Sequence, residues 1–359
     1  MQEPASRGHD VGARGSVPKI NCQTRTRGNG HAAAILYFMY VKGSTNAGTR
    51  QTLRSFRRRI ERLAADRTSG ASELLAESLA LLLDLSAALE HGCFGTWPSI
   101  LHPEPIALTD GEGRSRLLAL LRALQCSQPS MAPILNLGHA ALQLAKMAND
   151  CQGLTKELIN LARHWKQRGK QAQREIAVTL QELLRGARHV VTYSRSSTVL
   201  AGLRACRRSG LRFRISISQG SPQMEGVAAA RALAQIGFEV TLTTDAGLFG
   251  MLEEADALLI GGDAIIRAGI VNKIGTRALV ETGRRHKVPV YSICGHGKLL
   301  PSDLEPLFCI RCGEGSELLP RKPKSFRSSH RNLHLLNPYF DITPLRFIAR
   351  VIPETRELP

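Results

Sequence analysis

Residues 258–276 bring a carboxylate, an amide and an ammonium close together along the chain. An apolar run ends in Gly-Gly-Asp263, a glycine-broken loop follows, and a helical pattern begins after a polar set. That set is Asn272, Lys273, Gly275 and Thr276. A buried strand that ends at Asp263 fits this order, because parallel α/β sheets bind ligands at the carboxyl ends of their strands. An ammonium beside the backbone N–H groups of a helix start suits an anion.

A structural interpretation of the same residues remains open. In it, Asp263 and Lys273 form an ion pair that holds the loop, and Asn272 caps the following helix. This alternative needs no ligand, so the stretch alone does not decide between binding and scaffold roles.

Strands that alternate with helices are expected to position these residues. Strand patterns at 190–194, 213–219, 239–245, 257–263 and 288–294 alternate with helical patterns at 198–209, 226–236, 247–254 and 276–286. This order is typical of a parallel sheet covered by helices on both faces. The predicted strands end in Ser194, Gln219, Asp245, Asp263 and Cys294. Because parallel strands share one carboxyl edge, we expect a polar site there.

Between residues 51 and 186 the apolar residues recur at helical spacing. Helical patterns cover 52–63, 72–89, 112–126, 132–148 and 155–184, and the last has an outer face rich in Arg, Lys and Gln. We therefore predict an α/β protein in which an N-terminal helical domain (51–186) is joined by a long helix to a Rossmann-like parallel-sheet domain (187–359). Residues 1–50 lack a sustained period and are expected to form a disordered basic arm.

The formal charge is +18, and half of the excess lies in residues 1–62, where twelve Lys and Arg face three Asp and Glu, a net of +9. Such a balance favours anionic partners. Contact with nucleic acid through the basic arm is one hypothesis, and a solvated arm is the alternative. A second basic segment holds Arg321, Lys322, Lys324, Arg327 and Arg331.

The cysteines indicate the cellular compartment, and the short motifs indicate whether a cofactor is expected. Eight cysteines without framework spacing are typical of reduced thiols in a cytoplasmic protein. The pair Cys309 and Cys312 has no second pair nearby, so no metal is expected. No nucleotide-binding or metalloprotease motif occurs, and no cofactor is expected.

The apolar run at 32–41 is too short to cross a bilayer, and no membrane contact is expected. It fits either the apolar part of a signal peptide or an upstream extension with the real start at Met39, and we favour the extension.

Several segments occur in the order of a known family. They are residues 66–74, 192–198, 221–226, 244–246, 261–276 and 337–344. In these segments the chain resembles the alpha, beta and delta subunits of eukaryotic initiation factor 2B. That group shares its fold with methylthioribose-1-phosphate isomerase and archaeal ribose-1,5-bisphosphate isomerase. The resemblance covers roughly residues 52–353.

The resemblance implies sugar-phosphate chemistry that this chain has partly lost. In the isomerases, a cysteine and an aspartate do the proton work between an aldose 1-phosphate and a ketose phosphate. The aspartate falls on Asp263, but Ser194 replaces the cysteine, and a hydroxyl is far weaker without a neighbouring base. Ser221 stands where an arginine is expected to grip phosphate, and Gly295 replaces a glutamate.

The remaining positions still suit an anion. The expected ligand-binding set is Arg195, Ser196, Asp245, Asn272, Lys273, Gly275, Thr276 and Lys298. Arg195 is a candidate for the missing positive charge, and Cys294 for the missing thiol.

Three functions are compatible with these residues. The favoured one is a non-catalytic regulatory protein like the initiation factor 2B alpha subunit, which forms a homodimer or higher homo-oligomer and binds a phosphorylated small molecule or a protein partner. The second is an aldose-1-phosphate to ketose-phosphate isomerase of the ribose-1,5-bisphosphate type with altered site chemistry. The third is a nucleic-acid-associated protein that uses its basic segments.

Overall fold

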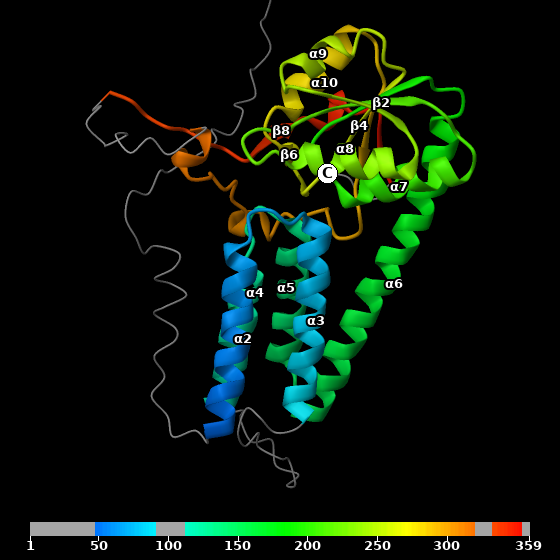
Figure 1. The fold of residues 1–359 in the computed structure, drawn as a ribbon. Coiled ribbons are helices and arrows are strands. Elements are labelled where there is room, and N and C mark those ends of the chain that lie inside the picture. The colour runs from blue at the N-terminus through cyan, green and yellow to red at the C-terminus, as the bar shows by residue number, and fades with distance from the viewer. Residues whose placement is uncertain (1–46, 91–111, 320–331, 354–359) are drawn as a thin grey trace, which may run out of the picture.

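The computed structural model describes residues 47–90, 112–319 and 332–353 (Figure 1). The predicted basic arm up to residue 46 and the basic segment 320–331 lie outside the described residues. Among the described residues, no helix is long and apolar enough to cross a membrane.

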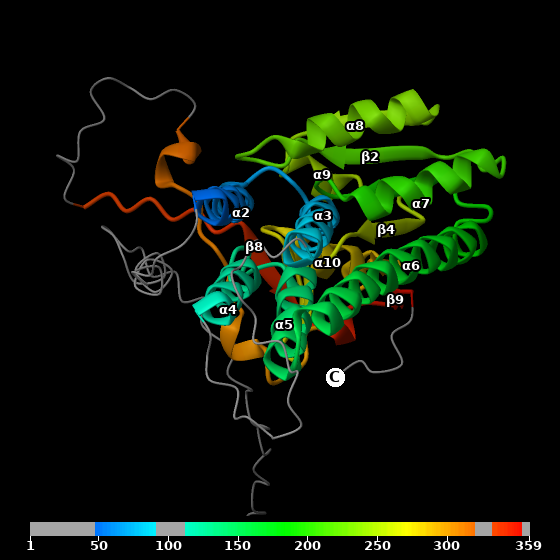
Figure 2. The ribbon, with the colours of Figure 1, turned by 90° about the horizontal axis from the view of Figure 1, so that it is seen from below.

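Helices make up the N-terminal half of the described chain. They are α2 (Ala47–Ala65), α3 (Ala71–Glu90), α4 (Glu112–Gln125), α5 (Ala132–Met147) and α6 (Cys151–Leu183). Their leucine-rich faces bury one common core, which also takes in Trp165 of α6. The side chain of Asp150 starts α6 by accepting a hydrogen bond from the Gly153 N–H at 2.6 Å. This long helix then runs from the bundle to the sheet (Figures 1 and 2).

A six-stranded parallel sheet follows, and five of its strands lie in the predicted segments, whereas the sixth, at Arg350–Ile352, was not predicted as a strand. Its strands are β1 (His189–Thr192), β2 (Arg214–Ser218), β3 (Glu239–Thr243), β4 (Ala257–Ile260), β7 (Val290–Ile293) and β9 (Arg350–Ile352). Their order is β3-β2-β1-β4-β7-β9. The chain moves outward from β1 to β3 and then returns to place β4 beside β1 on the other side. Ligands of such sheets bind at this reversal point, outside the carboxyl ends of the two strands.

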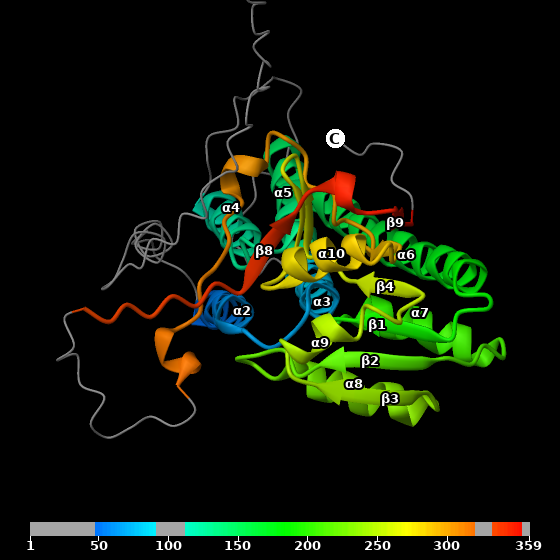
Figure 3. The same ribbon diagram turned by 90° about the horizontal axis from the view of Figure 1, so that it is seen from above.

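Alternate residues of the strands pack against helices on opposite faces of the sheet. Val190 and Leu259 join a core with α6, α7 (Ser197–Arg208) and α8 (Glu225–Ile236). Val191 and Leu258 join a second core with α9 (Gly247–Gly250) and α10 (Thr276–Arg285). Figure 3 shows the order of the strands, and Figure 1 shows α9 and α10 above the sheet and α7 and α8 below it. Helix α9 is shorter than the predicted 247–254.

The glycine-broken loop predicted after Asp263 is a hairpin instead. Strands β5 (Ala264–Ile266) and β6 (Gly269–Lys273) pair antiparallel, and β8 (Phe340–Thr343) adds to β6. Gly269 has a φ of 140°, and a Cβ there would lie 2.1 Å from the Thr343 carbonyl oxygen, so only glycine fits between the strands. The sequence pattern missed the hairpin because both strands are short. As a result, Lys273 is presented from a strand end rather than from a loop.

Candidate functional site

A cavity of about 320 Å³ lies at the reversal point of the sheet, beyond the carboxyl ends of β1 and β4. The segment between α2 and α3, residues 67–70, and the start of α3 line its opposite side. Seven of the sequence-predicted site residues line this cavity. They are Ser194, Arg195, Ser196, Asp263, Asn272, Lys273 and Lys298. The cavity therefore lies between the helical bundle and the sheet, with polar groups from both.

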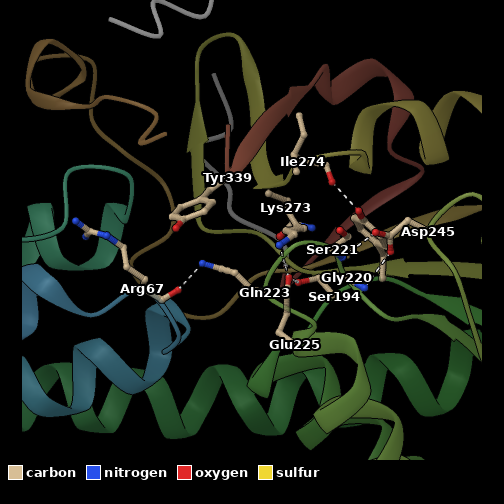
Figure 4. A network of polar contacts seen from close by, with 12 residues as sticks. Arg67, Ser194, Gly220, Ser221, Gln223, Glu225, Asp245, Lys273, Ile274 and Tyr339 are labelled. Carbon is tan, nitrogen blue, oxygen red and sulfur yellow. Dashed lines mark hydrogen bonds and ion pairs between the residues drawn. The ribbon is translucent and has the colours of Figure 1, made fainter. Parts of the chain in front are cut away.

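Glu225, the first residue of α8, is the centre of the polar contacts in the cavity wall (Figure 4). Its Oε1 accepts a hydrogen bond from Ser194 Oγ at 3.0 Å and lies 2.7 Å from Lys273 Nζ. The side chains of Lys273 and Glu225 are only 6% and 16% exposed. Ser194 itself has a φ of 62°, a conformation rare for residues other than glycine and common where a site fixes a side chain.

Sequence reasoning missed Glu225. An acid in the first turn of a helix is common for electrostatic reasons alone, so the residue carried no distinguishing signal. Its partners come from the segment just after β1 and from β6, which are distant along the chain, and only the fold brings the three side chains together.

Asp263 pairs with Lys298, not with Lys273. The Asp263 Oδ1 to Lys298 Nζ distance is 3.7 Å. Burial raises the pKa of the Asp263 carboxyl and lowers the pKa of the Lys298 ammonium, and each partner opposes the shift of the other. The structural alternative of an Asp263–Lys273 pair is therefore wrong. The hairpin explains why: the Asp263 N–H donates to the Val271 carbonyl, and Lys273, two residues further on, reaches Glu225 instead.

Arg195 joins the sheet to the helical bundle across the cavity. Its guanidinium donates to both oxygens of Glu73 in α3, at 3.2 Å from Nη1 and 2.5 Å from Nη2. The two side chains are 34% and 37% exposed. Glu73 also accepts from the Gly70 N–H at 3.1 Å. Ser196 caps α7 by accepting from the Val199 N–H at 3.3 Å. The charge of Arg195 is thus present at the cavity but already matched.

The predicted helix-start site for an anion is filled by the protein itself. Asp341 of β8 accepts the Gly275 N–H at 2.8 Å and the Arg277 N–H at 3.1 Å. Burial raises the pKa of Asp341 to about 6, despite these donors. Gly275, not Asn272, is the N-cap of α10. Asn272 instead donates from Nδ2 to Thr276 Oγ1 at 3.1 Å.

Asp245, Gly275 and Thr276 do not line the cavity. Asp245 accepts the N–H groups of Gly220 and Ser221 at 2.9 and 2.7 Å, which fixes the turn after β2. Thr276 Oγ1 donates to the Lys273 carbonyl at 2.5 Å. We assign these three residues a structural role and leave them out of the ligand-contacting set.

A family profile, described as the Initiation factor 2 subunit family (IF-2B), matches residues 105–356. The chain belongs to this family. Its fold agrees, because solved structures of IF-2B-type proteins superimpose on most of it.

Relatives in the Initiation factor 2 subunit family carry two different names. A putative translation initiation factor eIF-2B subunit 2-like protein from Pyrococcus furiosus is 29% identical over 66% of this chain and 79% of its own length. A ribose 1,5-bisphosphate isomerase from Haloferax volcanii is 25% identical over 68% of this chain and 76% of its own. The sequence relatives therefore do not decide between the initiation-factor-like and the isomerase interpretations.

Two solved structures show the shared fold. The tetrameric eIF2B-beta2-delta2 complex from C. thermophilum matches with a TM-score of 0.62, 15% identity and coverage of 86% of this chain and 92% of that chain. The 5-methylthioribose 1-phosphate isomerase from Pyrococcus horikoshii matches with a TM-score of 0.61, 16% identity and coverage of 83% and 82%.

Cys294 does not line the cavity of this IF-2B family member. Its side chain is buried at the end of β7, with Sγ 3.3 Å from Ser292 Oγ. Burial raises the pKa of the thiol, which disfavours the reactive thiolate. The lining of the described cavity therefore includes no thiol, and Ser194 occupies the place where the isomerase resemblance implies one.

The other cysteines add no site among the described residues. Cys126, Cys151, Cys206, Cys294 and Cys309 are free thiols, whereas Cys312 is disulfide-bonded, which departs from the expected set of reduced thiols. No group of three or more potential metal ligands occurs within the described part of the chain.

Proposed function

We propose that this chain is a non-catalytic regulatory member of the IF-2B family that binds a phosphorylated small molecule in the cavity. The observation that carries the proposal is at position 194. The hydroxyl of Ser194 stands where the isomerase resemblance implies a thiol, and it donates to a carboxylate that is already paired with Lys273. A hydroxyl in this arrangement positions a ligand or a neighbouring side chain better than it exchanges protons with carbon.

Ligand binding is supported by the cations of the cavity wall. Within the described residues, Lys273 Nζ makes no contact with hydrogen-bond geometry, although it lies close to Glu225. Lys273 also lines the cavity, so a phosphate oxygen bound there would share this ammonium with the Glu225 carboxylate. Arg195 adds a positive charge at the cavity that a ligand would share with Glu73. Ser69, Ser72 and Ser197 line the cavity with hydroxyls that suit a sugar.

Isomerase activity is the second candidate, and Asp263 favours it. A buried carboxyl with a raised pKa remains protonated closer to neutral pH and can donate a proton to a sugar oxygen. Ser194 also has a neighbouring base in Glu225, which the sequence did not predict. Proton abstraction would require Glu225 to leave its pair with Lys273, and for this reason we place catalysis second.

Further parts of the proposal concern assembly and location. We propose that the chain forms a homodimer or larger homo-oligomer, since the eIF2B-beta2-delta2 relative of this fold is a tetrameric complex. We also propose a cytoplasmic location. Multi-angle light scattering of the full chain tests the first part: an oligomer is expected, and a monomer at micromolar concentration would contradict it.

Thermal unfolding with added ligand tests the proposed function. Ribose 5-phosphate, ribose 1,5-bisphosphate and adenosine monophosphate are compared with unphosphorylated ribose. A ligand at a hundredfold excess over its dissociation constant stabilises by about 2.7 kcal/mol, which raises the melting temperature measurably. At least one phosphorylated compound is expected to protect, and Arg195→Gln is expected to weaken that protection. No protection by any of them would contradict phosphosugar or nucleotide binding.

A further inference from the structure

Helix α6 carries a run of positive charge that the cavity does not explain. Between Glu157 and Glu175 the helix holds five cations and no acid. They are Arg163, Lys166, Arg168, Lys170 and Arg174, and all five are exposed.

Four of these cations form one stripe on the helix. Arg163, Lys166, Lys170 and Arg174 follow each other at intervals of three, four and four residues, which places them on one face. We call these four residues the α6 stripe. At 1.5 Å per residue the stripe spans about 17 Å of the helix. Exposed Gln167 and Gln171 fall between its members along the chain.

The α6 stripe has no compensating acid. Among the described residues none of its four members forms an ion pair, whereas two half-buried arginines of α2 do: Arg57 pairs with Glu61 and Arg59 with Asp84. Like charges at this spacing repel and destabilise a helix slightly. A bound polyanion would reduce this repulsion between the four cations.

The opposite face of α6 is buried in the protein. Leu158, Ala162, Trp165 and Ile176 pack into the cores of the bundle and the sheet. Figure 1 shows α6 along an outer edge of the molecule, with the other helices of the bundle on one side of it. The stripe is thus held on a fixed, straight support that faces outward.

We propose that the α6 stripe binds the phosphodiester backbone of a nucleic acid. Regularly spaced cations with interleaved amides match a linear, repeating array of phosphates, which takes contacts from Arg, Lys and Gln. An anionic membrane fits less well, because surface helices that bind lipid need an exposed apolar face, and that face of α6 is buried. An acidic protein fits less well, because the stripe offers no exposed aromatic anchor.

The test uses the full chain and fluorescein-labelled 20-nucleotide RNA, single-stranded DNA and duplex DNA, with affinity measured by anisotropy between 50 and 200 mM salt. The triple variant Lys166→Gln, Lys170→Gln and Arg174→Gln removes three cations. For single strands, each lost phosphate contact lowers the salt slope by about 0.7, so the slope is expected to fall by about 2. Affinity at 100 mM salt is expected to fall on the order of tenfold.

A matched triple variant on α2, Arg54→Gln, Arg58→Gln and Arg62→Gln, removes the same charge from another exposed helix face. Glutamine is a good helix former, so both variants should keep the wild-type circular dichroism. The α2 variant is expected to retain most of the binding. Equal losses in both variants, or an unchanged α6 variant, would overturn the proposal. Binding to phosphatidylserine vesicles or polyglutamate without binding to oligonucleotides would also overturn it.

Discussion

The cations of the cavity and those of α6 differ in one respect that separates their roles. Lys273, Lys298 and Arg195 each lie beside a carboxylate, contributed by Glu225, Asp263 and Glu73. The four cations of the α6 stripe have no ion-pair partner among the described residues. The two lysines of the cavity are buried, and the stripe is exposed.

Burial explains the difference. A buried charge without a partner costs several kcal/mol, so the fold supplies a carboxylate for each buried lysine. An exposed charge is solvated and needs none. A ligand in the cavity must therefore share its cations with carboxylates, which favours a small, well-fitted anion. A polyanion bound to α6 would interact with cations that have no carboxylate partner, but salt would screen this interaction strongly because the cations are exposed.

The largest expected effect comes from removing a lysine of the cavity, compared with removing a lysine of the α6 stripe. Lys273→Ala leaves Glu225 buried without its partner and is expected to destabilise the protein by about 3 to 5 kcal/mol in urea unfolding. Lys170→Ala on the exposed face of α6 is expected to change stability by less than about 0.5 kcal/mol.

The double variant Lys273→Met with Glu225→Met controls for the lost charge pair. Replacing both partners by apolar side chains of similar size is expected to recover most of the lost stability. If Lys273→Ala and Lys170→Ala changed the free energy of unfolding by similar amounts, the Lys273–Glu225 pair would be as well solvated as an exposed lysine, which would contradict the account.

A second expected effect concerns Asp341, a buried carboxyl held by backbone N–H groups rather than by a cation. Its pKa is raised from 3.8 to about 6, so the folded state binds a proton more tightly than the unfolded state. The stability contributed by this protonation is present below pH 4 and is lost as the pH rises through about 6. Relative to Asp341→Asn, the wild type should therefore lose about 2 to 3 kcal/mol between pH 4 and 7.

The measurement is urea unfolding of both proteins across this pH range. Asparagine keeps an acceptor for the two N–H groups but does not titrate, so it isolates the carboxyl. A stability difference that stays constant with pH, or that grows in favour of the wild type, would show that the carboxyl is well solvated or well paired when ionised.

Among the changes at the cavity, the smallest expected effect on stability comes from Glu73→Gln, which turns a paired cation of the cavity into an unpaired one. A pair about one-third exposed contributes at most about 1 kcal/mol. Freed from Glu73, Arg195 should bind a phosphorylated ligand several-fold more tightly in calorimetric titration. Weaker binding in this variant would mean that Glu73 positions Arg195 for the ligand.

Much of the fold could be predicted from the sequence, because long periodic segments carry clear signals. The parallel strands β1, β2, β3, β4 and β7 and the helices α3 to α8 and α10 follow the predicted ranges within a few residues, whereas β9 was not predicted. The β5–β6 hairpin escaped because two strands of three and five residues around Gly269 read as a glycine-broken loop. This omission led to a wrong ion pair, because the hairpin determines which carboxylate pairs with Lys273.

Seven of the ten predicted site residues line the cavity, but the pairing of its charged groups was not predicted. Strand-end reasoning brought Ser194 and Asp263 together correctly, because parallel strands share one carboxyl edge. It could not find Glu225, whose role depends on contacts with two other elements. It also treated the start of α10 as open, whereas Asp341, far along the chain, already fills it. These charged pairs join residues that are far apart along the chain, so no local spacing could predict them.

The most direct measurement is a turnover assay of the purified full chain with ribose 1,5-bisphosphate, run beside thermal unfolding with the same compound. A non-catalytic binding cavity predicts protection against unfolding without formation of the ketose phosphate, in the wild type and in Asp263→Asn alike. Formation of the ketose phosphate by the wild type, abolished in Asp263→Asn, would contradict it and establish the isomerase.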